Sequence, residues 1–416
     1  MNVAFVVDRF PALSESFVLD QMTGLIDRGI EVDVFARHES TGEPTHPDVD
    51  EYGLRARTTY FGPPTGWPRR TAGALAIASR HLTSSPVALL RALNPVATGR
   101  DALSLRTLYM MDGFAAADPS TYDVIHCHFG PNGVAGCALR DLLALPAKLV
   151  TSFYGYDVSH RRWRRRDGRY RRLFRKGDLF IAISDDMRAR LADLGCPADR
   201  IALLPLGIDL RRFEVPQRGS GDGDRTVVAT VARLIEKKGL EYSIRAIAKL
   251  RDRNRQVLYK IIGDGPLRPQ LQDLIEELGV GDAVQLLGWA DPAGVRELLE
   301  QADIFVLPSV TAADGDQEGT PTVLLEAQAM GLPVVSTLHA GIPEIVDDGR
   351  SGYLVRERDA EALAERLADL IGDRELRAEL GRAGRANVEA RHDARALAAQ
   401  LEEIYRRLVT TNAGSD

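Results

Sequence analysis

The chain has 416 residues, of which 44% are hydrophobic and 27% charged, and its net charge is −6. These values are ordinary for a globular protein, exclude a disordered or fibrous chain, and suit two domains of about 200 residues each. The cysteines Cys127, Cys137 and Cys196 are too few and too scattered for a disulfide framework or a zinc site, so we expect buried thiols. The N-terminus lacks a signal-peptide pattern, and no run of about 18 apolar residues occurs, so a cytoplasmic location is expected.

The N-terminal half alternates short apolar strands with helical patterns. An amphipathic helix is predicted over residues 16–29, whereas much of 38–120 shows no clear pattern. Strands are predicted at residues 3–8, 31–36, 123–130, 148–155 and 179–184. This alternation is typical of a doubly wound parallel sheet.

A break in the pattern predicts the domain organisation. Residues 214–225 are rich in Gly and Asp and have no apolar period, which indicates a linker between an N-terminal domain (1–213) and a C-terminal domain (226–395). After it, strands are predicted at 226–232, 257–263, 283–288, 303–309 and 332–337. The predicted fold is α/β, with two Rossmann-like doubly wound domains facing each other across a cleft. A helical pattern over 359–410 follows, and its last part (396–416) is expected to pack back on the N-terminal domain.

The segment Arg161–Lys176 holds ten basic residues and one acid on a chain that is acidic overall. Aromatic and aliphatic residues are interleaved with the arginines. One interpretation is a patch that faces an anionic membrane surface, and another is a solvated arginine-rich helix. No nucleic-acid-binding motif accompanies it, so nucleic acid is not expected as a partner.

The stretch "QEGTPTVLLEAQAMG" follows a predicted strand and begins a helix. Thr320 is predicted to cap that helix, with Pro321 in its first turn and Met330 at its end. Helix N-termini at the carboxyl edge of a parallel sheet favour anions such as phosphates. Glu318 precedes the helix, and Glu326 lies about 7.5 Å along its axis from Pro321. The two carboxylates can therefore accept hydrogen bonds from different hydroxyls of one elongated ligand; alternatively, Glu326 is a buried carboxylate satisfied within the protein.

A second loop supplies positive charge at the same predicted edge. In "VARLIEKKG", Arg233 and Lys238 lie between the first strand of the C-terminal domain and a glycine that opens the next helix. Cations here can hold a diphosphate and neutralise the charge that develops when a bond to it breaks. Solvated surface side chains are the alternative.

Together these motifs resemble the donor domain of retaining, nucleotide-sugar-dependent glycosyltransferases of family 4. The resemblance rests on "VARLIEKKG", "IIGDGPL" and the long stretch from "QEGTPTVLLEAQAMG" to "DDGRSGYLV". The N-terminal motifs "FPALSESFVLDQM", "VIHCHFG" and "GYDVS" resemble the branch associated with exopolysaccharide and colanic acid assembly. The resemblance implies a GT-B fold and transfer of a hexose-type sugar from a nucleotide diphosphate sugar.

The resemblance also implies roles for individual residues. Glu318 and His128 are expected to contact the donor sugar at the reacting centre, with His126 a weaker candidate. The expected nucleotide-sugar contacts are Arg233, Lys238, Gly319, Thr320, Pro321, Thr322 and Glu326. A UDP-sugar is the preferred donor and a GDP-sugar the main rival. The acceptor is expected to be a glycan or lipid-linked oligosaccharide.

Two departures bear on these expectations. Tyr154 stands where many relatives carry a histidine. The "DGD" of residues 314–316 imitates the metal-binding motif of another glycosyltransferase fold, yet it lies in the donor loop beside cations, so no metal and no other cofactor is expected.

Competing functions fit less well. A dehydrogenase would need G-x-G-x-x-G after a first strand, which "GDGPLR" does not match, and no pyridoxal-lysine motif indicates a phosphorylase. A non-catalytic protein that binds sugar or nucleotide on the same fold, and a transferase that acts on a small secondary metabolite, are the alternatives left open.

Overall fold

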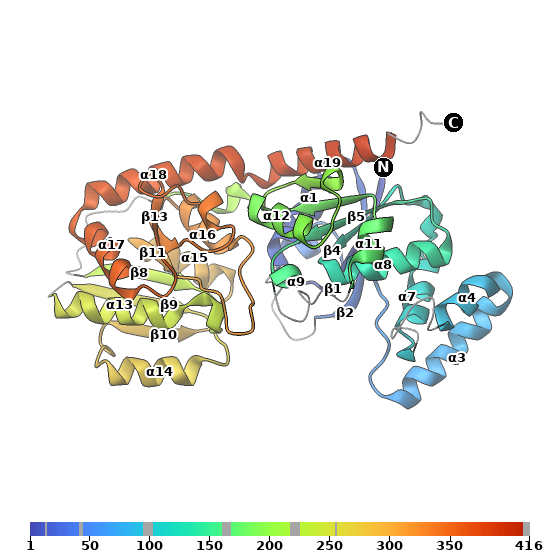
Figure 1. Ribbon diagram of the computed structural model, residues 1–416, viewed down its shortest axis with the longest axis horizontal. Coiled ribbons are helices and arrows are strands. Elements are labelled where there is room, and N and C mark those ends of the chain that lie inside the picture. The colour runs from blue at the N-terminus through green and yellow to red at the C-terminus, as the bar shows by residue number, and fades with distance from the viewer. Residues whose placement is uncertain are drawn as a thin grey trace.

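The computed structural model describes residues 1–12, 15–40, 45–94, 103–159, 168–216, 225–253 and 256–410. Two parallel sheets lie side by side, each flanked by helices, and the helices α18 (Arg374–Arg391) and α19 (Ala394–Thr410) run along one side of both (Figure 1). Most of the predicted linker, residues 217–224, lies outside the described residues.

The first sheet has seven parallel strands in the order β3-β2-β1-β4-β5-β6-β7. Its strands are β1 (Asn2–Phe10), β2 (Glu31–Glu39), β3 (Thr58–Tyr60), β4 (Val124–His128), β5 (Lys148–Phe153), β6 (Leu179–Ala182) and β7 (Ile201–Leu203). Its central strands are buried on both faces, which is why they appear as nearly continuous apolar runs. The two three-residue edge strands were not predicted.

Helices cover this sheet, including the region between residues 38 and 120 that had no clear pattern. They are α1 (Ser16–Ile26), α2 (Asp48–Glu51), α3 (Trp67–Ser84), α4 (Pro86–Leu93), α7 (Arg106–Ala115), α8 (Gly130–Leu143), α9 (Tyr156–Ser159), α11 (Arg171–Lys176) and α12 (Asp185–Asp193). The helix predicted over 16–29 therefore ends earlier, at Ile26.

The second sheet repeats the arrangement with six parallel strands in the order β10-β9-β8-β11-β12-β13. Its strands are β8 (Thr226–Val231), β9 (Val257–Ile262), β10 (Val284–Gly288), β11 (Ile304–Leu307), β12 (Val334–Thr337) and β13 (Gly352–Val355). Its helices are α13 (Leu240–Asp252), α14 (Arg268–Glu277), α15 (Pro292–Gln301), α16 (Thr322–Ala329) and α17 (Ala360–Gly372). In both sheets the strand order reverses beside the first strand, which is where doubly wound folds bind ligands.

The helical pattern over 359–410 is divided into three helices. The carboxylate of Asp359 accepts a hydrogen bond from Ala362 N–H at the start of α17, and Asp373 accepts one from Leu376 N–H at the start of α18. Such caps satisfy backbone donors that have no partner within the helix, so each begins a new helix.

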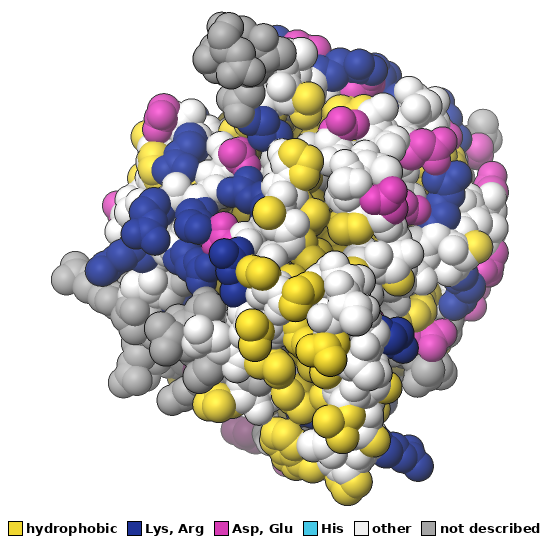
Figure 2. All heavy atoms as spheres, turned by 90° about the vertical axis from the view of Figure 1, so that its right-hand side faces the viewer, with side chains coloured by type: hydrophobic (Ala, Val, Ile, Leu, Met, Phe, Trp, Pro, Cys, Tyr) yellow, Lys and Arg dark blue, Asp and Glu magenta, His cyan; other side chains and the backbone are white. Residues whose placement is uncertain are grey.

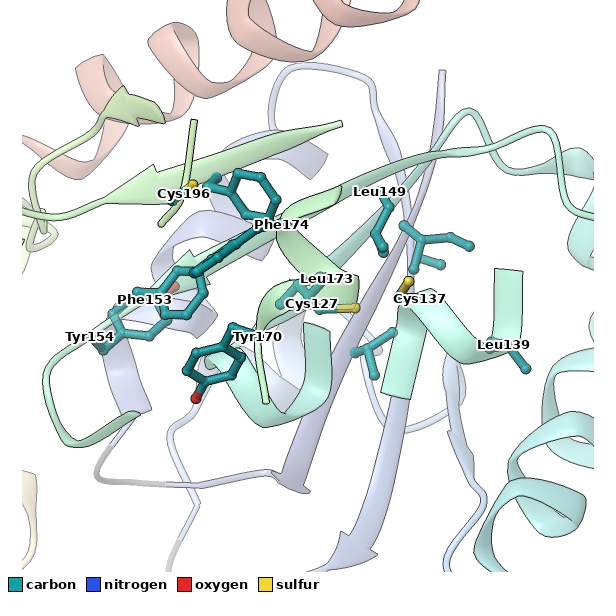
Figure 3. Packing of buried hydrophobic residues seen from close by; sticks show 14 of the residues in the cluster. Cys127, Cys137, Leu139, Leu149, Phe153, Tyr154, Tyr170, Leu173, Phe174 and Cys196 are labelled. Atoms are coloured by element: carbon teal, nitrogen blue, oxygen red, sulfur yellow. The ribbon is translucent and has the colours of Figure 1, made fainter. Parts of the chain in front are cut away.

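The three cysteines are buried, as predicted. Figure 3 shows Cys127 of β4 and Cys137 of α8 among aliphatic side chains, and Cys196 near Phe174. Burial raises the pKa of all three thiols, that of Cys196 to about 12, so they stay protonated and unreactive at neutral pH.

The last helix, α19, packs against α1 of the N-terminal domain (Figure 1). The helices approach closely, because a Cβ atom on Gly24 would lie 2.6 Å from the Cβ of Ala398. Tyr405 extends from α19 into the core of this domain, where its side chain is fully buried and its hydroxyl lies 2.6 Å from His126 Nδ1. Two successive helices, α18 and α19, which are separated by His392 and Asp393, thus connect the two domains.

Candidate active site

The loop between β11 and α16, together with α16 itself, carries most of the predicted donor residues. The helix begins at Thr322, and Pro321 occupies the preceding position with extended ψ, so the prediction that Thr320 caps the helix is wrong. The extended ψ of Pro321 keeps this residue outside the helix, so the helix begins one residue later than predicted and Pro321 is its N-cap residue. Thr320 Oγ1 is instead buried and has no hydrogen-bond partner among the described residues.

Glu318 and Lys238 form the centre of the site. Lys238 Nζ lies 2.6 Å from Glu318 Oε1, and both side chains are largely buried. Burial alone would raise the pKa of Glu318, but the ammonium groups of Lys238 and Lys237 outweigh burial and lower it. Glu318 is therefore a buried carboxylate that stays ionised because a cation faces it.

Two residues that the sequence analysis missed fix the backbone at Glu318. The fully buried His339 accepts a hydrogen bond from Glu318 N–H at Nε2 (3.0 Å), and its Nδ1 lies 2.6 Å from Glu357 Oε1. Because Nε2 accepts, Nδ1 carries the proton and donates to Glu357. Glu357 in turn accepts from Thr311 N–H at 2.9 Å. This chain of hydrogen bonds holds the Glu318 loop against β12.

The same loop contacts both domains. Lys237 Nζ lies 3.1 Å from Asp316 Oδ2, and Gln317 N–H donates to Ser159 Oγ of the N-terminal domain at 3.2 Å. Arg190 on α12 also donates to the side chain of Gln317. The loop that carries Glu318 is therefore held from both sides.

Backbone approaches backbone at Gly319. A Cβ atom here would lie 1.8 Å from the carbonyl oxygen of Tyr154, and one on Gly155 would lie 2.7 Å from Gly319 N. Only glycine fits such contacts, so the end of β5 and the donor loop meet without intervening side chains.

His128 lies at the end of β4 and is fully buried. Its Nδ1 is 2.6 Å from the hydroxyl of Tyr154, while Nε2 has no hydrogen-bond partner among the described residues. Burial, followed by the neighbouring His126, lowers the pKa of His128 well below its usual value, so the ring is neutral. In the tautomer in which Tyr154 donates to Nδ1, the neutral ring carries its proton on the unpartnered Nε2.

His126 is not available to a ligand in the same way. Its Nε2 contacts Ser152 Oγ at 2.7 Å, and its Nδ1 contacts the Tyr405 hydroxyl at 2.6 Å. Burial lowers the pKa of His126 to about 3, which keeps it neutral in the core. The weaker sequence candidate is thus a structural histidine.

Asp157 organises the turn that carries Tyr154. Its buried carboxylate accepts backbone N–H bonds from Gly130 (2.9 Å), Tyr154 (3.1 Å) and Gly155 (3.0 Å). The ends of β4 and β5 are therefore tied together beside His128. The motif "GYDVS" contained this residue, but the sequence alone did not indicate its partners.

Glu326 lies on α16, eight residues after Glu318 in the sequence. Its side chain is partly exposed, although protein surrounds most of it. Burial and then the carboxylate of Asp20 raise the pKa of Glu326 to about 7, against the opposing effect of Arg212. Arg212 forms ion pairs with Asp20 (3.0 Å) and with Asp48. The remaining predicted donor contact, Arg233, has an exposed side chain, and no hydrogen bond or ion pair joins that side chain to another described residue.

The segment Arg161–Lys176 is described only from Gly168 onward, so the basic residues at 161, 162 and 164–166 lie outside the described residues. Within the described part of the chain, no helix has both the length and the apolarity needed to cross a bilayer.

Comparison with known proteins agrees with this geometry. A family model described as "Glycosyl transferases group 1" matches residues 212–387, and one described as "Glycosyltransferase Family 4" matches residues 14–212. The putative colanic acid biosynthesis glycosyltransferase WcaL of Escherichia coli K12 is 40% identical over 376 residues, which cover 88% of this chain and 90% of that protein. The amylovoran biosynthesis glycosyltransferase AmsK of Erwinia amylovora is 36% identical, over 98% of this chain and all of that protein.

Among solved structures, HepE of Anabaena in complex with UDP superimposes with a TM-score of 0.73, covering 97% of this chain and 99% of that one. Its 19% identity supports the two-domain GT-B fold alone. The chain therefore belongs to the family 4 glycosyltransferases and is a glycosyltransferase with the GT-B fold.

Proposed function

We propose that this glycosyltransferase moves a hexose-type sugar, with retention of configuration, from a nucleotide diphosphate sugar to a hydroxyl group of a glycan or lipid-linked oligosaccharide. The observation that carries the proposal is the buried Glu318–Lys238 pair beside the N-terminus of α16. An ionised carboxylate in this place can accept hydrogen bonds from sugar hydroxyls, and the cation beside it can bind phosphate.

The diphosphate is assigned to Lys238, Arg233 and the backbone from Gly319 to Thr322. The N–H groups at a helix start have no partner within the helix, and they favour an anion. Lys238 is already oriented by Glu318, whereas Arg233 is exposed and is proposed to move onto the ligand when it binds. In this assignment the cations stabilise the negative charge that develops on the leaving diphosphate.

Glu326 is assigned to the ribose hydroxyls. A carboxylate whose pKa is raised to about 7 by burial gains from hydroxyl donors, because they stabilise its ionised form. UDP is the preferred nucleotide, and HepE, which shares the fold, is described in complex with UDP.

His128 is assigned to the donor sugar. When Tyr154 donates to Nδ1, the unpartnered Nε2–H is a buried donor for a sugar oxygen. In the proposed front-face reaction the bond from the sugar's anomeric carbon to the leaving phosphate breaks as the acceptor oxygen bonds to the same carbon on the same face. The leaving phosphate takes the acceptor's proton, so no protein base and no covalent nucleophile is required.

We further propose that no divalent ion is required. Asp316 is engaged by Lys237 and lies 3.4 Å from Ser159 Oγ, and Asp314 accepts from Asp316 N–H, so the carboxylates of "DGD" serve the loop itself. We expect the rate of donor hydrolysis to be unchanged in EDTA. A rate that disappears in chelator and returns with Mn²⁺ or Mg²⁺ would contradict this.

The names of WcaL and AmsK place those proteins in colanic acid and amylovoran biosynthesis, which supports an exopolysaccharide role and a lipid-linked glycan acceptor here. A peripheral position on an anionic membrane, through Arg161–Lys176, belongs to the same proposal. A small secondary-metabolite acceptor is the alternative.

Slow hydrolysis of a panel of UDP-, GDP- and ADP-sugars by the wild type and by Glu326→Ala tests the proposal. We expect one nucleotide sugar to be consumed by the wild type, and Glu326→Ala to lose about tenfold or more in apparent affinity, because it lacks the hydrogen bonds of a charged acceptor. Neither turnover nor nucleotide binding by the wild type would contradict the proposed function and favour a non-catalytic role.

A further inference from the structure

Two helices of the N-terminal domain expose an apolar surface that the proposed reaction does not use. Of the large hydrophobic side chains that the described residues expose, many lie on α3 and α4. We name as the α3–α4 surface the side chains Trp67, Leu75, Leu82, Val87, Leu90 and Leu93. Leu75 is 73% exposed and Leu90 is 71% exposed, so both side chains project into solvent and are not partly covered residues at the margin of a hydrophobic core.

The same helices already have a buried side. Ile77 on α3 and Leu89 on α4 pack with Leu108 and Met111 of α7 and Leu142 of α8 in a small separate core. The apolar residues of the α3–α4 surface lie at other positions of both helices and are not needed for that packing. A surface helix normally carries polar residues on its outer side, so this second apolar side indicates a partner.

The charges around the surface indicate what kind of partner it is. Residues 67–94 contain four arginines and no Asp or Glu. Arg69 and Arg91 are exposed, and Arg70 lies 5.5 Å from the ring centre of Trp67. The helix α11, which packs against α8 as α4 does, adds the exposed side chains of Arg171 and Arg175. Figure 2 shows Lys and Arg side chains gathered beside a strip of hydrophobic ones on this face.

We propose that the α3–α4 surface inserts into an anionic lipid bilayer, with the arginines of α3, α4 and α11 at the level of the headgroups. Leucines and a tryptophan bordered by arginines match the boundary between acyl chains and headgroups. A second copy of this chain fits less well, because it would bring two positively charged rims together. The inference extends the membrane position proposed above for Arg161–Lys176 to a separate apolar surface, and it does not depend on the proposed sugar transfer.

Vesicle binding tests the inference without any need for turnover. The wild type is expected to sediment with vesicles of equal parts phosphatidylglycerol and phosphatidylcholine, and high salt should weaken this binding. Leu82→Asp combined with Leu90→Asp should weaken it by at least about tenfold, because two leucines no longer enter the acyl region. The matched control Leu287→Asp, at a 48% exposed leucine of the other domain, should bind like the wild type.

A second measurement does not depend on how the double variant folds. Trp67 is made the only tryptophan by Trp163→Phe and Trp289→Phe, and its emission is expected to shift to shorter wavelength on these vesicles. Three results would overturn the inference: unchanged Trp67 emission, equal binding by the double variant and the wild type, or a wild-type dimer that the double variant converts to monomer.

Discussion

Lys238→Met should lower kcat by about a hundredfold, which is the usual loss when one preorganised charge at a developing anion is removed. Methionine keeps the length and most of the volume of lysine, so the change removes mainly the charge. Two effects act together. The diphosphate loses a cation, and the pKa of the buried Glu318 rises because only Lys237 still lowers it among the lysines, which makes Glu318 easier to protonate and a poorer acceptor for sugar hydroxyls.

Lys249→Met is the matched control, because Lys249 pairs with Glu361 at the surface (2.6 Å), where such pairs contribute little. Its turnover should equal that of the wild type. Steady-state kinetics with the donor that the panel identifies, together with thermal unfolding of each variant, separate lost catalysis from lost folding. Full turnover in a folded Lys238→Met variant would remove Lys238 from the proposed site.

Tyr405→Ala should lower the free energy of unfolding by about 3–5 kcal/mol, as large-to-small changes of fully buried aromatic residues do. The change leaves a cavity between α19 and the N-terminal domain, and it also leaves His126 Nδ1 without its partner. Tyr405→Phe keeps the ring and should cost about 1–3 kcal/mol, the typical penalty for one buried unpaired polar group.

Glu403→Ala, on the exposed side of the same helix, is the control and should change stability by less than about 0.5 kcal/mol. Denaturant unfolding measures all three variants, and limited proteolysis after α18 reports whether α19 detaches. Equal stability of Tyr405→Ala and the wild type would show that α19 does not hold the domains together.

The strands were predictable because parallel strands buried on both faces appear as short apolar runs. The positions at which the strands end were harder to predict. The predicted strand 303–309 continued past the end of β11 at Leu307, because Pro308 and Ser309 are buried in the active-site loop and do not pair with a neighbouring strand. The edge strand β3 is three residues long, which is too short to produce an alternation.

The charged centre of the site was predictable in part. Glu318 and Lys238 follow different strands of one sheet, and parallel topology brings the carboxyl ends of those strands to one edge. Their separation in sequence did not indicate a direct ion pair. His339 and Glu357 were missed because their hydrogen bonds join segments far apart in the chain, and such partners depend on tertiary packing.

The sequence analysis also missed the α3–α4 surface, although the sequence contains all of its hydrophobic residues. Leu75 and Leu82 fit an amphipathic helix whose apolar residues face a core, and only the packed structure places them in solvent.

Proton NMR of the donor hydrolysis reaction tests the central claim most directly, because it reads both the consumed nucleotide sugar and the configuration of the released sugar. With an α-linked donor, the account predicts that free α-sugar appears first and equilibrates with the β form later. First appearance of the β form would contradict the retaining reaction assigned to Glu318, Lys238 and His128.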